Sequence, residues 1–423
     1  MGSVPPGPHL VLFTRDLRVH DHPALSAAGG AGEVVPLFVL QPGLLRRSPN
    51  RHRFLLEALR DLDRSLRGLG AGLVVRSGDA VSEAARLARD LGCAAIHLTA
   101  DVSPFARRRE RRLREACASS GIEVRTWPGN AVVEAGAVRP SGADHYRVFT
   151  PYLRAWLAAV RRPILPAPRS VRIPAGVDPG RLPDPSSVRT DAQRLPPGGE
   201  APGRELLHRF LRGNLARYGR DRDLLASTPT SRLSPYLRFG CLSAAEVAGL
   251  AERGEGGTSF VRQLAWRDFF RQLLAGEPRL LRESLRPRPT AGRAAGSPAA
   301  DLERWRAGRT GHPLVDAAMR QLRTEGWLPN RARLVAASFL CRTLGIDWPE
   351  GAAHFDRLLV DGDPASNAGN WQWVAGTVAN PRPNRALDPD RQARRFDPEG
   401  EYVRRHLTDP GSRGRATRRG RVR

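Results

Sequence analysis

The first third of the chain alternates short apolar runs with amphipathic stretches, and this alternation restricts the fold more than any other feature. The apolar runs have the length of strands and lie near 9–14, 33–40, 72–76, 94–99 and 122–126. Helical patterns fill about 51–68, 79–92 and 103–120. Almost uninterrupted apolar strands that alternate with helices indicate a parallel sheet covered on both faces, because crossover connections place helices there. We therefore predict an α/β domain with a parallel sheet over residues 1–135.

A region dense in Pro, Gly, Arg and Asp, with little periodicity, runs from about 162 to 203. Such composition is typical of a connector that lies on the surface. We assign residues 136–203 as an interdomain linker. The last dozen residues are mostly Arg and Gly with almost no apolar side chains, so residues 409–423 are predicted to form a disordered basic tail.

Between the linker and the tail nearly every segment has a helical pattern. Pro313 can open a helix that Gly326 closes, and Asn330 can cap a helix running to Gly345. We predict an all-α domain over residues 204–408.

The formal net charge is +25, and every basic side chain apart from histidine is arginine. An arginine excess of this size indicates a polyanionic partner such as nucleic acid, because guanidinium groups bind phosphate and release its counterions. Genomic base composition is an alternative explanation for the absence of lysine, with much of the arginine as solvated surface, but it does not explain the excess over acids.

Other features exclude several protein classes. The longest apolar runs, such as Val34–Leu40, are too short to span a membrane, and no secretory leader is visible, so we expect a cytoplasmic protein without a membrane partner. The four cysteines are far apart and lack paired spacing, which favours neither a zinc site nor disulfides. Asp361-Gly-Asp363 begins like a calcium loop but lacks the later glutamate, so no metal is expected.

Three segments carry groups suited to binding chemistry. Thr230 to Ser234 brings hydroxyls and the Arg232 guanidinium within a few residues, which suits a pyrophosphate, although a helix cap with a surface arginine would have the same sequence. On a helix beginning near Phe260, the side chains of Gln263, Trp266 and Arg267 share one face. A ring beside a guanidinium can stack on an unstacked base, although a half-buried Trp is an equally simple interpretation.

The third segment ends in Trp371-Gln-Trp373, a local aromatic pair in a chain with only 6% aromatic residues. Core packing is the ordinary explanation of such a pair.

Taken in order, these segments resemble the DNA photolyase/cryptochrome family, and most closely its class I cyclobutane pyrimidine dimer photolyases. The resemblance covers nearly the whole chain. Its matching stretches are Phe13–Leu25, Tyr146–Tyr152, Thr230–Ser234, Trp266–Phe269, Thr310–Leu322, Asp361–Trp373 and Arg394–Arg404.

The resemblance implies a Rossmann-like N-terminal domain that can hold an antenna chromophore, a folate or a deazaflavin, and a helical C-terminal domain that holds FAD. It implies that the FAD-binding residues are Tyr218, Thr230, Ser231, Arg232, Leu233, Ser234, Asn330, Arg333, Asp361, Gly362, Asp363 and Asn367. Arg333, paired with Asp361, would stabilise an anionic reduced flavin ring by Coulomb attraction. Asn367 corresponds to the residue that contacts flavin N5.

The implied function is light-dependent repair of cyclobutane pyrimidine dimers in DNA by electron transfer from photoexcited reduced FAD, with the damaged pair flipped out of the duplex. The implied DNA-binding residues are Gln263, Trp266, Arg267, Asn330, Arg331, Trp373 and Gln392. Members of the family are commonly monomeric, and we expect a monomer here.

A chain of three tryptophans reduces resting flavin in the family, and Trp371 and Trp348 match the inner two. The outermost position is Ala295, so we expect less efficient photoreduction unless Trp305, Trp327 or a tyrosine substitutes. Gln263 replaces a frequent glutamate, and the chain ends soon after His406. The main alternative function is that of a cryptochrome, a blue-light signalling flavoprotein without repair activity.

Overall fold

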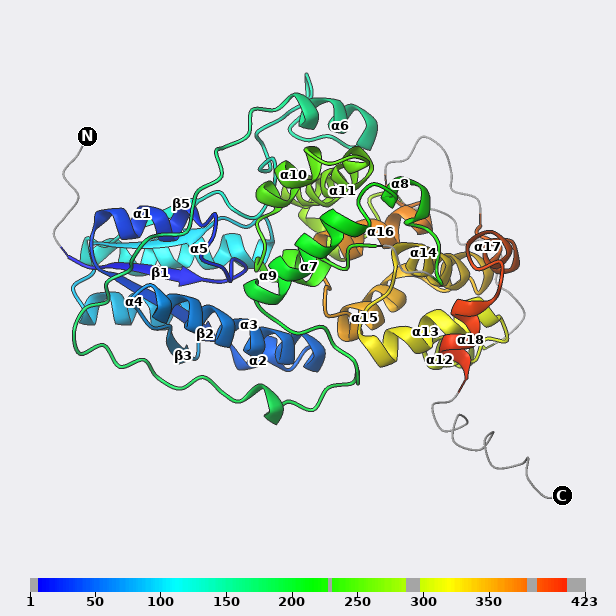
Figure 1. The fold of residues 1–423 in the computed structure, drawn as a ribbon, viewed down its shortest axis with the longest axis horizontal. Coiled ribbons are helices and arrows are strands. Elements are labelled where there is room, and N and C mark those ends of the chain that lie inside the picture. Colours follow the sequence, from blue (N-terminus) through cyan, green and yellow to red (C-terminus); the bar gives the residue numbers. More distant parts are fainter. Residues whose placement is uncertain (1–6, 227–229, 287–296, 379–385, 409–423) are drawn as a thin grey trace.

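The computed structural model describes residues 7–226, 230–286, 297–378 and 386–408. The predicted tail at 409–423 and Ala295 lie outside these residues. Figure 1 shows an α/β part on one side of the molecule and a helical part on the other, as predicted. In the described residues, no helix is both long and apolar enough to cross a membrane.

The α/β part is built on a five-stranded sheet with the order β3-β2-β1-β4-β5, in which every pair is parallel. The strands match the five predicted runs to within a residue or two at their ends. They are β1 His9–Phe13, β2 Val34–Leu40, β3 Val74–Ser77, β4 Ala95–Thr99 and β5 Glu123–Trp127. Every residue of β1, β2 and β4 is buried, which is why their sequences are almost continuously apolar.

Helices cover both faces of this sheet. Alternate residues of β1 enter different cores: Leu10 and Leu12 pack with one set of side chains, Val11 and Phe13 with another. The first core is closed by α4 Ala80–Asp90 and α5 Pro104–Cys117, the second by α1 Pro23–Ala31 and α3 Pro49–Gly68. A short helix, α2 Pro42–Leu45, precedes α3.

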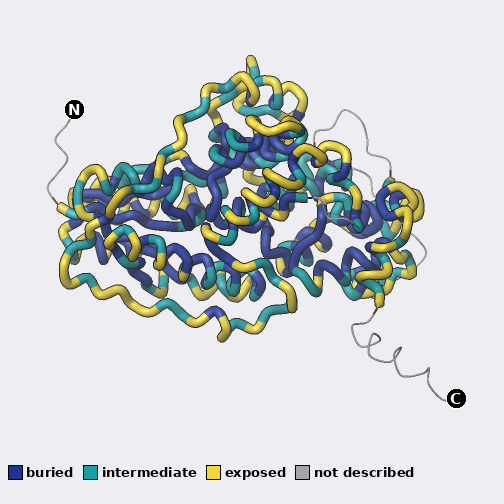
Figure 2. The backbone as a smooth tube through the Cα atoms, viewed as in Figure 1, coloured by how far each residue is buried: buried dark blue, intermediate teal, exposed yellow. Residues whose placement is uncertain are grey.

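The second core continues into the helical part, because one cluster of buried apolar side chains contains residues of both parts. Buried segments, dark blue in Figure 2, are present in both parts. The helical part contains α7 Glu200–Gly213, α8 Tyr218–Asp221, α9 Ser234–Phe239, α10 Ala244–Glu252, α11 Gly257–Gly276, η3 Pro278–Leu281, α12 Pro298–Ala307, α13 Pro313–Glu325, α14 Asn330–Ser338, η4 Phe339–Thr343, α15 Trp348–Leu358, α16 Pro364–Ala375, α17 Pro389–Phe396 and α18 Glu401–Leu407.

The helix signals in this part were largely correct. Pro313 opens α13, and Gly326 closes it with a φ of 61°, a left-handed conformation that suits glycine. Asn330 is a correction: it is the first residue of α14, and Pro329 occupies the cap position without a side-chain hydrogen bond. The helix then continues as the π-helical turn η4 and stops before Gly345, whose φ is 64°.

The range 136–203 contains more structure than a linker. Helix α6, Phe149–Ala158, lies inside it, and α7 already begins at Glu200. Helix α6 packs on α11, where the Phe149 ring stacks on Trp266 with ring centroids 3.7 Å apart. Between α6 and α7 the chain forms a long irregular segment along the surface, interrupted only by the turn η2 Pro185–Ser187 (Figure 1).

Candidate functional site: a cavity in the helical part

A cavity of about 520 Å³ opens among α8, α9, α11, α14 and α16. Its wall combines apolar rings with arginine, asparagine and carboxylate groups. This mixture and volume are typical of a cofactor or ligand pocket. Every predicted FAD-binding residue lines it: Tyr218, Thr230, Ser231, Arg232, Leu233, Ser234, Asn330, Arg333, Asp361, Gly362, Asp363 and Asn367.

An ion pair between Arg333 and Asp361 forms one wall. The Arg333 Nη2 donates to Asp361 Oδ2 over 2.6 Å, and its Nε donates to the Leu328 carbonyl over 2.9 Å. The Asp361 side chain is only 2% exposed, yet its Oδ1 has no hydrogen-bond partner among the described residues. A buried carboxylate oxygen is costly to leave unsatisfied. This oxygen therefore fits a ligand that donates a hydrogen bond, such as a hydroxyl or ring N–H.

Asp363 anchors the loop that leads into α16. Its Oδ1 accepts from the Ser366 N–H over 2.9 Å and caps the helix, and its Oδ2 accepts from Arg15, which follows β1. Burial alone would raise the pKa of the Asp363 carboxyl, but the positive charges of Arg15 and Arg238 outweigh it and hold the pKa well below its ordinary value. The carboxylate is therefore ionised throughout the neutral range.

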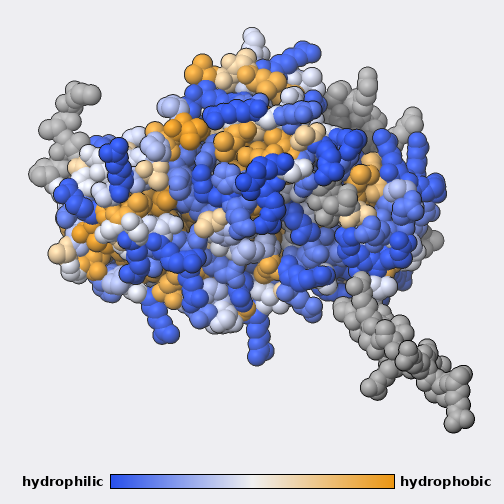
Figure 3. All heavy atoms as spheres, in the orientation of Figure 1, coloured by the Kyte–Doolittle hydropathy of each residue, from blue (hydrophilic) through white to orange (hydrophobic). Residues whose placement is uncertain are grey.

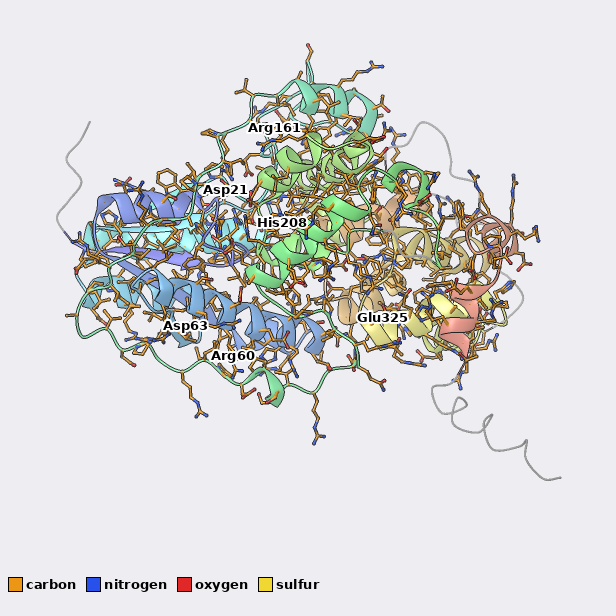
Figure 4. The ribbon with its side chains drawn as sticks, in the orientation of Figure 1. Asp21, Arg60, Asp63, Arg161, His208 and Glu325 are labelled. Carbon is orange, nitrogen blue, oxygen red and sulfur yellow. The ribbon has the colours of Figure 1, made fainter. Side chains whose placement is uncertain are left out.

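The Thr230–Ser234 segment lies at another edge of the cavity. Arg232 has a φ of 52°, and its guanidinium lies 4.4 Å from the Trp327 ring centroid and 3.0 Å from Glu325. Glu325, labelled in Figure 4, is the last residue of α13. Ser234 Oγ accepts from Trp327 Nε1 over 3.1 Å, which leaves its hydroxyl proton free to donate to a ligand. Burial raises the pKa of Tyr218 to about 12, so its hydroxyl stays protonated.

The predicted DNA-binding side chains on α11 lie at the cavity, but their surroundings differ from the expectation. Trp266 has one face covered by Phe149. Arg267 donates to the carbonyl of Asn130 over 2.7 Å and to that of Leu237 over 3.3 Å, so it links the two parts of the molecule. Gln263 also lines the cavity.

The remaining predicted DNA-binding residues surround the end of α14. Asn330, Arg331 and Trp373 line the cavity, whereas Gln392 does not. Gln392 instead accepts a hydrogen bond from Arg331 Nη1 over 3.3 Å. Arg331 also pairs with Asp223 over 2.9 Å, and these contacts position it at the rim.

The predicted electron-transfer residues are divided between the wall and the core. Trp371 lines the cavity, and Trp348 is buried outside it at the start of α15. A Cβ on Gly351 would lie 2.1 Å from the Trp371 ring, so α15 approaches Trp371 one turn after Trp348. The Trp305 ring centroid is 6.1 Å from that of Trp371.

Asn367 lines the cavity with a defined amide orientation. Its Nδ2 donates to the Ala352 carbonyl over 3.0 Å, which leaves Oδ1 as the acceptor.

Several lining residues were missed by the sequence analysis, among them Arg238, Arg262, Phe270, Phe355 and Asn370. Asn370 is four residues after Ser366 on the same face of α16, and helical spacing from Asn367 could have identified it. Arg238 could not have been found this way, because its role depends on the buried loop that it contacts. Its Nε donates to the Gly362 carbonyl over 2.7 Å.

Comparison with known proteins agrees with this architecture. The family profile described as DNA photolyase matches residues 9–170, and the profile described as FAD binding domain of DNA photolyase matches residues 260–410. A deoxyribodipyrimidine photo-lyase of Streptomyces griseus is 51% identical, with 93% of this chain and 88% of the relative covered. That of Thermus thermophilus is 38% identical, with 94% and 92% covered, and a cryptochrome DASH of Gloeobacter violaceus is 34% identical, with 95% and 85% covered.

Solved structures give the same result. A bacterial class III photolyase from Agrobacterium tumefaciens has a TM-score of 0.86 at 31% identity, with 96% of this chain and 87% of that chain covered. A Synechocystis cryptochrome also reaches 0.86, at 28% identity and with coverages of 96% and 89%. With a two-part fold, a cavity and a sequence match over more than nine tenths of the chain that all agree, the chain belongs to the DNA photolyase/cryptochrome family.

Proposed function

We propose that this chain is a deoxyribodipyrimidine photo-lyase that binds FAD in the cavity and repairs cyclobutane pyrimidine dimers in DNA under light. The observation that carries the proposal is the cavity itself, in which every predicted FAD-binding residue lies, in a chain 51% identical to a protein of that name. The net charge of +25 supports a DNA partner.

The residues present fit FAD. The hydroxyls of Thr230, Ser231 and Ser234 would bind its phosphates, with Arg232 near them. The free Oδ1 of Asp361 would accept from the ligand, while Arg333 places a positive charge beside the flavin ring. When bound and reduced, FAD would supply the light-excited electron that opens the cyclobutane ring and is recovered afterwards.

The chain's own contribution is to position and shield these groups. Asn367 would present its amide Oδ1 to a protonated flavin nitrogen, since its Nδ2 is held by Ala352. Trp266 and Trp373 would pack against the flipped bases, and Gln263 would hydrogen bond their edges. Arg331, held by Asp223 and Gln392, would contact the DNA strand at the rim.

We also propose an antenna chromophore at the carboxyl ends of β1 and β4. The strand order reverses between these two strands, and ligands of open parallel sheets bind at such a point. Arg15 follows β1, Asp101 follows β4, and Arg109 Nε has no partner among the described residues. An archaeal photolyase from Sulfolobus tokodaii, 30% identical with a TM-score of 0.84, holds two FAD molecules. Acid extraction of purified protein followed by chromatography identifies the chromophore as a folate, deazaflavin or second flavin.

The deciding experiment illuminates reduced, purified protein with blue or near-ultraviolet light and an oligonucleotide carrying one thymine dimer, beside a dark control. Light-dependent restoration of the thymines is the expected result. A protein that retains FAD but gives no repair in the light would instead be a cryptochrome-type signalling protein, and a colourless protein that cannot bind added FAD would overturn both functions. Light scattering of the same sample tests the expected monomer.

A further inference from the structure

The α/β part reaches the cavity wall through the start of α3. The Nδ2 of Asn50 donates to the carbonyl of Leu358 over 2.6 Å, and the Nη1 of Arg51 donates to the carbonyls of Asp356 and Leu359, the latter over 3.1 Å. Asp356 and Leu358 belong to the last turn of α15, whose final C=O groups have no partner within the helix, and Leu359 is the C-cap residue that follows it. Side chains from the α/β part thus cap the end of a helix in the helical part.

The capped turn leads directly into the cavity wall. The chain passes from Leu359 to Asp363 in five residues, and Leu359, Asp361, Gly362 and Asp363 all line the cavity. Within this segment the Gly362 N–H donates back to the Leu359 carbonyl over 3.3 Å, which is the oxygen that Arg51 also binds. A shift of Arg51 would therefore be transmitted to Gly362 and Asp361.

The side chain of Arg51 also lies close against residue 362. Gly362 does not have a positive φ, so its backbone conformation does not require glycine. A Cβ at this position would instead lie 2.5 Å from Arg51 Nη1. The Arg51 side chain is only 14% exposed. Asn50 is completely buried, and its Oδ1 accepts from the Ala192 N–H over 3.0 Å, which fixes its orientation.

From these contacts we infer that Arg51 and Asn50 are positioning residues for the proposed flavin site, which they do not line. They fix the position of the segment 359–363, in which Asp361 forms its ion pair with Arg333 and Asp363 forms its ion pair with Arg15. The inference rests on the proposed function, since it concerns the affinity of that site for FAD. The α/β part is therefore a structural component of the flavin site, in addition to any antenna function.

The test compares Arg51→Ala with Arg53→Ala in the full chain. Arg53 lies on the same helix and, in the part of the chain that the structure describes, pairs only with Glu57 of that helix, over 2.7 Å. Its loss therefore tests the effect of removing an arginine from α3. The dissociation constant of FAD is measured by quenching of flavin fluorescence, well below the melting temperature of each variant. Arg51→Ala is expected to weaken FAD binding roughly tenfold or more, because the hydrogen bonds lost come from a charged donor. Arg53→Ala is expected to bind FAD as the unchanged chain does.

A double-mutant cycle separates positioning from a general loss of stability. Gly362→Ala keeps every donor but places a methyl group against the guanidinium. If Arg51 positions the loop, Gly362→Ala weakens FAD binding strongly in the unchanged chain and much less in the Arg51→Ala background. Arg51→Lys, which keeps one donor but not the fork, is expected to recover part of the affinity.

The outcomes are distinguishable. Unchanged FAD affinity in Arg51→Ala with only a lower melting temperature, or additive effects in the cycle, would overturn the positioning role. Failure of the unchanged chain to bind FAD would instead refute the proposed function. If Arg51→Ala does not fold, Arg51→Lys and Gly362→Ala supply the same comparison.

Discussion

Arg333 and Asp361 form an ion pair in which the acid is almost fully buried and the base is 26% exposed. We predict that Asp361→Ala lowers the free energy of unfolding by roughly 2–3 kcal/mol, somewhat less than for a completely buried pair, because Arg333 can regain some water. FAD affinity should fall as well, since the acceptor Oδ1 is lost. Chemical denaturation and flavin titration measure the two effects.

The matched control for this substitution is Asp90→Ala. Asp90 also pairs with an arginine, Arg86, over 3.4 Å, but its side chain is 56% exposed. An exposed pair of this kind contributes about 0–1 kcal/mol. If Asp361→Ala were no more destabilising than Asp90→Ala, the ion pair at the cavity would have no structural importance.

A second residue-scale feature is the histidine pair inside the sheet. His97 is completely buried, its Nε2 lies 3.0 Å from His9 Nδ1, and its Nδ1 accepts from Trp127 Nε1 over 3.1 Å. Burial, followed by the charge of His9 and of Arg125, lowers the pKa of His97 to about 4. In the unfolded chain His97 therefore becomes protonated near pH 6.5, whereas in the folded chain it becomes protonated only near pH 4.

Because the unfolded state binds more protons in that interval, the stability that His97 contributes is complete above pH 6.5 and is lost as the pH falls towards about 4. We predict that His97→Gln flattens the decline of the melting temperature between these values, whatever its effect on stability at neutral pH. His208→Gln, a change at an exposed histidine on α7 (Figure 4), should leave the decline unaltered. Equal slopes for both variants would contradict the prediction.

At the scale of elements, Asp268 of α11 joins three segments of the chain. Its Oδ2 accepts from the N–H groups of Val132 and Val133 and from Trp156 Nε1 of α6, over 2.9, 3.1 and 3.1 Å. Asp268→Ala would leave these buried donors unsatisfied, at about 1–3 kcal/mol each before relaxation. We predict a loss of roughly 3–5 kcal/mol in unfolding free energy. Asp301→Ala, on α12 where the acid pairs within one helix with an exposed arginine, is the control.

The elements that the sequence predicted well are those whose signal is local. Strands β1, β2 and β4 were found because fully buried parallel strands are almost continuously apolar, and α13 because Pro313 and Gly326 mark its ends. Helix α6 was missed because its ten residues were assigned to the linker with the Pro-rich segment that follows them, and because they are stabilised by contacts with α11. Its apolar residues Phe149 and Trp156 are buried by packing against α11, which is more than a hundred residues away in the sequence.

The candidate site shows the same distinction. The residues in short motifs, such as Thr230–Ser234 and Asp361–Asp363, were predicted and do line the cavity. The supports of that wall, Arg15, Arg51 and Arg238, could not be predicted, because each acts on a loop far away in the sequence. The carbonyl contacts of Arg267 could not be predicted either, because Asn130 and Leu237 are far from it in the sequence; its role at DNA stays a prediction.

At the scale of the whole molecule, the positive charge is spread widely rather than confined to the cavity. Figure 3 shows hydrophilic side chains over much of the visible face, and the formal net charge is +25. Many arginines are neutralised locally, as Arg67 is by Asp63 on α3 and Arg209 by Glu205 on α7. We therefore expect the arginines that contact DNA to be those at the cavity rim without such a partner on their own helix.

Arg262 is such a residue. It is exposed, lines the cavity, and its guanidinium lies 5.4 Å from the Phe149 ring centroid, next to the ring pair formed by Phe149 and Trp266. We predict that it binds a DNA phosphate. Arg262→Ala should then weaken binding to damaged and intact duplexes alike and reduce the slope of log affinity against log salt by about 0.9.

Trp266→Ala should behave differently, because stacking on the bases carries no counterion release. It should reduce the preference for dimer-containing DNA while leaving the salt slope unchanged. Arg111→Ala on α5 removes another exposed arginine, 69% accessible, from a helix that does not line the cavity, and should change neither the preference for dimer-containing DNA nor the salt slope appreciably. Titrations of fluorescent damaged and intact duplexes at several salt concentrations measure the preference for dimer-containing DNA and the salt slope. An Arg262→Ala slope equal to that of the unchanged chain would remove Arg262 from the DNA-binding surface, and an Arg111→Ala slope lowered by the same amount would mean that binding responds only to total charge.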